Sequence, residues 1–191
     1  MGTPARWTSA DLKSLPDDEL KRYEIIDGEL YVSSLGHVWH QMVVGGIVTA
    51  LAAWNEQSRV GLSVLAPGLV LSEYDDVVPD VVWISEARLA DAVDDNGHLR
   101  VAPELIAEVL MPGASDEKRD REAKLMLYSR SGVSEYWIVS WLLRAIDVYR
   151  RDQAQLHYVA TLHERDILES PLLPGFSSSV GRLFERIPAN Q

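Results

Sequence analysis

The stretch that decides the fold is LIAEVL at residues 105–110, a short apolar run with one carboxylate, Glu108, near its centre. Prolines flank the run, and an apolar segment of this length between prolines is typical of a buried β-strand. A second run, VVPDVVWI at residues 77–84, carries Asp80 in the same way. An ionised carboxylate taken out of water is costly unless a cation, a metal or hydrogen bonds compensate it. Two such groups indicate a shared site, which we interpret as the metal-binding half of a nuclease-like centre.

The positions of Asp80, Glu108 and Lys124 in the sequence indicate the chemistry of this centre. If the strands of Asp80 and Glu108 are neighbours, their carboxylates and the backbone carbonyl of Val109 offer three oxygens to one hard cation such as Mg²⁺. Lys124 follows Glu108 by 16 residues, near the middle of the next predicted helix. A lysine there is suited to orient or deprotonate an attacking water and to stabilise charge on a phosphate.

Periodicity along the rest of the chain predicts a mixed α/β fold. Asp27-Gly28, between two β-rich runs at residues 23–32, is the strongest local hairpin signal in the chain. Strands and helices then interleave without strict βαβ repetition, so we expect a central mixed sheet flanked by helices. Strands are predicted at 62–72, 77–84, 105–110, 135–139, 145–149 and 156–161, and helices at 38–57, 86–92 and 115–131.

Length and composition indicate one domain spanning residues 1–191. Within it, residues 1–22 are predicted to be a helical N-terminal segment and residues 162–191 a peripheral tail. The absence of cysteine excludes disulfides, thiolate zinc sites and cysteine nucleophiles. No leader-like N-terminus and no long apolar run are present, so we expect a cytoplasmic protein without membrane contact.

The net charge of −11 argues against a protein that simply coats nucleic acid. The charge is uneven, because residues 1–100 carry 7 basic and 16 acidic side chains, whereas residues 110–151 carry 8 basic and 6 acidic ones. Only the second region is suited to attract a polyanion. The alternative is that its basic residues, among them Arg119 and Arg121, belong to ordinary solvated faces.

Seven fragments together carry a resemblance to a known family. In order, they are YEIIDGEL at 23–30, His40, VPDV at 78–81, EVLMP at 108–112, DREAK at 120–124 with Tyr128, GVSEYWIV at 132–139 and SPLLPG at 170–175. Their order and approximate spacing resemble the bacterial Uma family of restriction endonuclease-like proteins, within the PD-(D/E)XK nuclease superfamily. The match runs from about residue 20 to about residue 185.

The resemblance implies a restriction-endonuclease-like fold and Mg²⁺-dependent hydrolysis of DNA phosphodiester bonds, with Mn²⁺ as a substitute metal. Carried over by position, Asp80 and Glu108 are the metal carboxylates, Val109 the carbonyl ligand and Lys124 the catalytic lysine. In the wider superfamily the lysine stands two residues after the second acid, where this chain has Leu110. The Uma pattern instead takes the amine from the following helix.

Two more residues, Glu24 and His40, fall on the family pattern and are expected to line the pocket. A homodimer is also expected, since enzymes that cut both DNA strands often pair two sites by two-fold symmetry.

Other interpretations remain open at this stage. One alternative is a nuclease-fold protein that no longer cleaves nucleic acid and serves as a binding or regulatory subunit. Another is a hydrolase that acts on sugars with a pair of carboxylates. For single residues, Glu108 is alternatively a buried partner of an arginine such as Arg121. Lys124 is alternatively an exposed helix-surface partner of Asp120.

Overall fold

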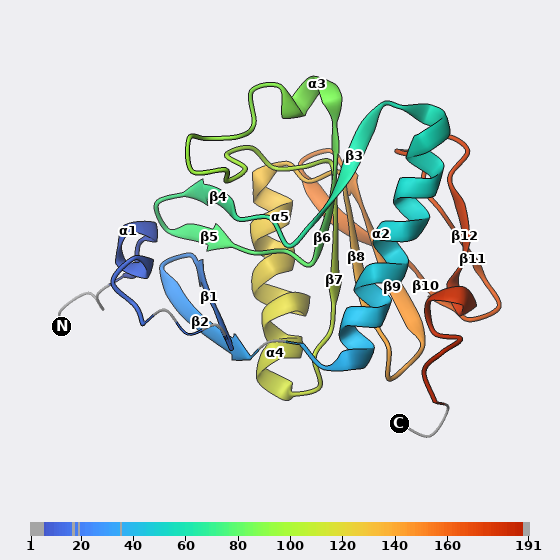
Figure 1. Ribbon diagram of the computed structural model, residues 1–191, viewed down its shortest axis with the longest axis horizontal. Coiled ribbons are helices and arrows are strands. Elements are labelled where there is room, and N and C mark those ends of the chain that lie inside the picture. The colour runs from blue at the N-terminus through green and yellow to red at the C-terminus, as the bar shows by residue number, and fades with distance from the viewer. Residues whose placement is uncertain (1–5, 17, 19, 35, 189–191) are drawn as a thin grey trace.

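The chain folds around a six-stranded mixed sheet, shown in Figure 1, and the computed structural model describes residues 6–188 except 17, 19 and 35. The strands of this sheet are β3 Gly61–Leu65, β6 Val81–Ser85, β7 Leu105–Val109, β8 Glu135–Ser140, β9 Ala145–Asp152 and β10 Gln155–His163. They lie in the order β10-β9-β8-β7-β6-β3. β7 and β8 pair in parallel, and the other neighbouring pairs are antiparallel. The predicted mixed sheet is confirmed.

A second sheet contains the N-terminal hairpin. Its strands are β1 Lys21–Ile26, β2 Glu29–Ser34, β4 Leu69–Ser72 and β5 Asp75–Val77, in the order β2-β1-β5-β4. The hairpin turn is Asp27-Gly28, whose φ angles of 52° and 76° are both positive. A type I′ turn requires positive φ at both central residues, so the hairpin prediction is confirmed.

Different helices cover the two faces of the large sheet. The helices are α1 Ser9–Leu12, α2 Val38–Ser58, α3 Glu86–Leu89, α4 Ala114–Lys118, α5 Leu125–Ser131, the π-helix η1 Arg119–Lys124 and the 3₁₀-helix η2 Val180–Leu183. Figure 1 shows the sheet between α2 and α5. No helix in the described ranges is long and apolar enough to cross a lipid bilayer.

The alternation of side chains along β7 decides which face carries Glu108. Ala107 and Val109 belong to the core on the α2 side, whereas Ile106 and Leu110 belong to the core that includes Leu127 of α5. Because Glu108 shares its face with Ile106 and Leu110, its side chain faces the helix that follows β7.

Two of the predicted strands are each divided in the structure. The segment 62–72 becomes β3 and β4, which lie in different sheets and are separated at Pro67 and Gly68. The segment 77–84 becomes the end of β5 and β6, and Asp80 lies in the bend just before β6. Prolines explain both breaks, because Pro67 and Pro79 have no backbone N–H to donate to a neighbouring strand.

The N-terminal segment is less helical than predicted. Within residues 6–22, apart from 17 and 19, only the single turn of α1 is α-helical, and β1 begins at Lys21. The predicted helical segment of residues 1–22 is therefore wrong beyond that turn, although residues 1–5 lie outside the described part of the chain.

The prediction of a peripheral tail at residues 162–191 is wrong for its described part. β10 extends to His163, and β11 Ile167–Glu169 pairs with β12 Ser177–Ser179. Leu173, Val180 and Phe184 are fully buried and join the core on the α2 side. The prolines mark turns between buried apolar residues, so they do not keep this segment on the surface.

Candidate active site

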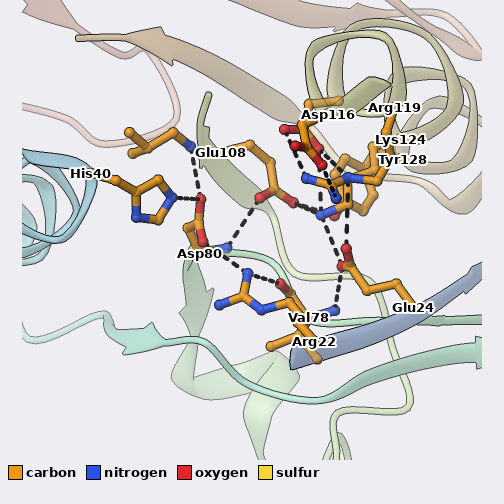
Figure 2. Close-up of polar contacts among 12 residues, drawn as sticks. Arg22, Glu24, His40, Val78, Asp80, Glu108, Asp116, Arg119, Lys124 and Tyr128 are labelled. Atoms are coloured by element: carbon orange, nitrogen blue, oxygen red, sulfur yellow. Dashed lines mark hydrogen bonds and ion pairs between the residues drawn. The ribbon is translucent and has the colours of Figure 1, made fainter. Parts of the chain in front are cut away.

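The pairing of β6 with β7 brings Asp80 and Glu108 together. In this antiparallel pair Val81 lies opposite Ala107, so residue 80 meets residue 108 one step further along. The backbone N–H of Asp80 donates to Glu108 Oε2 at 3.3 Å, and the N–H of Val109 donates to Asp80 Oδ2 at 2.9 Å. Figure 2 shows the two carboxylates at the centre of a network of polar contacts. The structure thus unites the two acids that the sequence singled out.

Asp80 is held as a carboxylate by donors from three elements. His40, from the first turn of α2, contacts Oδ2 at 3.1 Å, and Arg22 of β1 donates to Oδ1 at 3.0 Å. Asp80 is buried, which alone would raise its pKa. The hydrogen bond and charge of His40 and the charge of Arg22 outweigh that effect and hold the pKa of Asp80 well below its usual range.

Glu108 receives three hydrogen bonds, two of them on the same oxygen. Lys124 and Tyr128 donate to Oε1 at 2.8 and 2.7 Å, and the third is the long contact from Asp80 N to Oε2. Burial, together with the neighbouring charge of Asp80, raises the pKa of Glu108 to about 8 against the opposing effect of Lys124. A metal ion or an added cation would therefore be favourable at this carboxylate.

Lys124 lies fully buried between acidic side chains. Its ammonium is 2.8 Å from Glu108 Oε1, 2.9 Å from Glu24 Oε1 and 3.7 Å from Asp120 Oδ1. Burial alone would lower the pKa of Lys124, but these carboxylates raise it above its usual value. Glu24 keeps the ammonium charged even when Glu108 is protonated, so the geometry favours orientation and charge stabilisation by Lys124 over proton abstraction.

A π-helix places Lys124 and Asp120 on the buried face. The helix after β7 begins as α4, widens into η1 and continues as α5 to a left-handed cap at Gly132. Asp120 is almost fully buried, and Tyr136 of β8 donates to its backbone carbonyl at 3.0 Å. π-Helical turns frequently occur at functional sites. Here the turn spans the part of the helix that faces Glu108.

A small cavity of about 20 Å³ adjoins the two acids. Its lining residues are Arg22, Ser33, Ser34, Gly36, His40, Asp80, Glu108, Val109, Met111 and Arg119. This volume is enough for about one water molecule or a small ion. Glu24 and Lys124 lie behind Glu108 and are not among the lining residues.

The donor set of this cavity fits a hard divalent cation. Mg²⁺ is usually bound by one or two carboxylates and keeps several waters, and the cavity is lined by two carboxylates. No three His, Cys, Asp or Glu side chains in the described ranges are arranged to hold a metal by themselves. A bound ion here would thus take its remaining ligands from backbone oxygen and water. In addition, the buried Nδ1 of His40 has no hydrogen-bond partner among the residues that the structure describes.

Comparison with known proteins assigns the chain to a family. The family model described as "Uma2: Putative restriction endonuclease" matches residues 9–181. The chain belongs to the Uma2 family. The resemblance seen in the sequence is therefore confirmed. No curated protein matches the chain.

A solved structure shares the fold of this Uma2 protein. It is described as a putative nuclease belonging to DUF820 from Anabaena variabilis ATCC 29413. The two structures superpose with a TM-score of 0.74 at 18% sequence identity, covering 93% of this chain and 97% of the other. At this identity the match establishes the fold.

All the predicted site residues of the Uma2 chain lie in the same cluster, some lining the cavity and the others buried beside it. Asp80, Glu108, Val109 and His40 line the cavity, whereas Lys124 and Glu24 form a buried ion pair beside it. Val109 reaches the site through its N–H to Asp80. The role of its carbonyl as a ligand stays a prediction.

Sequence reasoning missed three side chains of this site. Arg22 and Arg119 line the cavity, and Tyr128 donates to Glu108. Arg119 lies among Glu24, Asp116 and Asp120 and is nearly buried, so it does not belong to a solvated face. A signal was available only for Tyr128, which falls on the same helix face as Lys124 at i+4.

Arg121 and Arg151, two basic residues of the 110–151 region, are engaged elsewhere. Arg121 pairs with Asp147 at 2.6 Å and not with Glu108. Arg151 donates to the backbone carbonyls of Ser129 and Val133 at the end of α5. These contacts satisfy structural acceptors, so Arg121 and Arg151 contribute to packing between elements of the fold.

Replacing Tyr128 by phenylalanine tests how Glu108 is positioned. The change removes one buried donor from Oε1 while keeping the ring that packs against Tyr136. We expect a loss of about 1–3 kcal/mol in the free energy of unfolding, measured by urea denaturation. The matched control is Tyr158→Phe on the exposed strand β10, which should change stability by less than about 0.5 kcal/mol. Equal effects of the two changes would contradict a special role of the Tyr128 hydroxyl.

Proposed function

We propose that this Uma2 protein is a metal-dependent endonuclease that hydrolyses phosphodiester bonds of DNA. The observation that carries the proposal is the meeting of Asp80 and Glu108 at one cavity, with the ammonium of Lys124 on Glu108. The family description and the nuclease-like structural neighbour support it. One acid in β7, one acid in the bend before the neighbouring β6, and one amine form a set of side chains suited to metal-assisted attack on a phosphodiester.

Asp80 and Glu108 would hold the metal, with Val109 supplying its carbonyl. When bound, a divalent cation would polarise the scissile phosphate and lower the pKa of a bound water. The same ion would stabilise the ionised form of Glu108, which burial and the charge of Asp80 disfavour. Mg²⁺ is the proposed ion, with Mn²⁺ as its substitute.

The remaining side chains hold these acids in place. His40 and the Val109 N–H fix Oδ2 of Asp80, and Arg22 donates to Oδ1. Lys124 fixes Oε1 of Glu108 and, from behind this carboxylate, would add a positive charge to the centre. Such a rigid arrangement reduces the reorganisation needed during the reaction.

Cleavage of supercoiled circular DNA tests the proposal. With Mg²⁺ or Mn²⁺ we expect nicked and then linear products, and none in EDTA. An RNA of the same sequence, tested in parallel, defines the substrate class. A folded protein that leaves single- and double-stranded DNA and RNA intact with both metals would contradict the proposal and favour the non-cutting alternative.

The proposed homodimer has its own measurement. If two sites act together on both strands, linear DNA should form early relative to nicked DNA, and light scattering should give twice the mass of one chain. A single-chain mass with purely stepwise nicking would contradict the dimer and leave the chemistry of the site untouched.

A further inference from the structure

Arg22 covers the one oxygen of Asp80 that the other donors leave free. Its Nη1 donates to Asp80 Oδ1 at 3.0 Å and to the carbonyl of Val78 at 3.1 Å. The other Asp80 oxygen, Oδ2, already accepts from His40 and from the Val109 N–H. A cation that binds Asp80 from the cavity thus meets an oxygen that already has a cationic partner.

The matching oxygen of Glu108 is only weakly engaged. Oε1 accepts from Lys124 and Tyr128, whereas Oε2 accepts a single long hydrogen bond of 3.3 Å from Asp80 N. Figure 2 shows Asp80 between Arg22 and Glu108. Of the four oxygens of these two carboxylates, Asp80 Oδ1 and Glu108 Oε2 thus accept the fewest hydrogen bonds, one each.

The charges around the cavity are unequal. Among the described residues, the buried carboxylates of the cluster are Glu24, Asp80, Glu108 and Asp120, and the cations that pair with them are Arg22, Arg119 and Lys124. When all four carboxylates are ionised, as a bound cation requires of its ligands, and His40 is neutral, four negative and three positive charges leave one negative charge in excess. Exchange of one monovalent guanidinium for a divalent ion would bring this sum to zero.

Arg22 is the cation of the cluster best placed to leave. Its side chain is 21% exposed, against 8% for Arg119 and none for Lys124. Arg119 is also held by Asp116 and Asp120, and Lys124 by two carboxylates at hydrogen-bond distance. Arg22 has one ion-pair partner in the cluster, so moving it toward solvent breaks the fewest contacts.

We propose that Arg22 is a displaceable cation that competes with a divalent metal ion for Asp80. In the metal-free protein Arg22 neutralises Asp80, and on metal binding it gives up Oδ1. The inference rests on the proposed metal site and adds its regulation, because Arg22 sets the metal concentration at which the site fills. The apparent affinity of such a site is reduced by the fraction of molecules in the competing state.

The variant Arg22→Gln tests the competition through Mn²⁺ binding to the full chain, measured by calorimetry and by the electron paramagnetic resonance of free Mn²⁺. If the form with the Arg22–Asp80 ion pair is about ten times more populated than the form without it, removing the Arg22 charge should lower the Kd for Mn²⁺ about tenfold. In EDTA the same variant should have a lower Tm than wild type, since Asp80 loses its partner. Mn²⁺ should then raise the Tm of the variant more than that of wild type.

The matched control is Arg121→Gln, which removes the ion pair with Asp147 outside the cavity and should bind Mn²⁺ as wild type does. If circular dichroism shows that Arg22→Gln does not fold, Arg22→Lys carries the test. An ammonium should hold Asp80 less firmly than the guanidinium, so this variant should also bind Mn²⁺ more tightly than wild type.

The outcomes separate this inference from the proposed function. In one outcome, wild type binds Mn²⁺, Asp80→Asn abolishes this binding, and the Arg22 variants bind no more tightly than wild type. That outcome would overturn the competition by Arg22 and leave the proposed metal site standing. No Mn²⁺ binding in wild type or in the Arg22 variants would overturn both.

Discussion

Replacing Asp80 by asparagine is expected to lower the rate of metal-dependent DNA cleavage by at least about 1,000-fold, or about 4 kcal/mol of transition-state stabilisation. Asparagine keeps the shape of the side chain and one oxygen that can accept from the Val109 N–H. It removes the charge that would hold the ion. Single-turnover nicking of supercoiled DNA measures the loss.

The control for this change is Asp95→Asn, because Asp95 is an exposed acid in the turn before Gly97. That variant should cleave at the wild-type rate. Circular dichroism of Asp80→Asn would check that the variant is folded. A folded Asp80→Asn protein that retains more than about a tenth of wild-type activity would remove Asp80 from the catalytic centre.

Replacing Lys124 by methionine is expected to lower the free energy of unfolding by about 3–5 kcal/mol, because it leaves buried carboxylates without their cation. Lys124 is fully buried and lies within 3 Å of both Glu24 and Glu108. Methionine fills a similar volume, so the loss reports the charge and not a cavity. Urea denaturation gives the free energy, and the same variant should also lose DNA cleavage.

Lys118→Met, in the exposed part of the same helix, should change stability by less than about 0.5 kcal/mol. Adding Glu24→Gln to Lys124→Met should recover part of the loss, since one unpaired carboxylate is removed. A loss below about 1 kcal/mol for Lys124→Met would show that the ammonium does not hold these carboxylates together.

The two acids of the site were predictable because each breaks a strong local pattern. Asp80 and Glu108 stand in apolar runs where folding alone does not require a charge, and alternation along a strand fixes the face of Glu108. Lys124 was proposed from its place in the helix after the Glu108 strand, and the family pattern added support, since the spacing alone also fits an exposed helix surface.

The partners of these acids could not be predicted from local patterns. Arg22 lies 58 residues from Asp80, and no spacing rule connects a hairpin strand to that bend. The π-helix was equally hidden, because residues 119–124 have the composition of an ordinary helix. The C-terminal segment was misread since its prolines dominate the pattern, while the burial of Phe184 depends on contacts with distant elements.

The long sequence separations within the candidate site have a consequence for the newly made polypeptide. The side chains around the cavity come from a hairpin, a bend, a long helix and the π-helix, with separations of 40 residues between His40 and Asp80 and 16 between Glu108 and Lys124. Contacts of this kind form only when distant parts of the chain have docked. The centre therefore cannot assemble until the newly made polypeptide extends past Lys124 and its distant parts have docked.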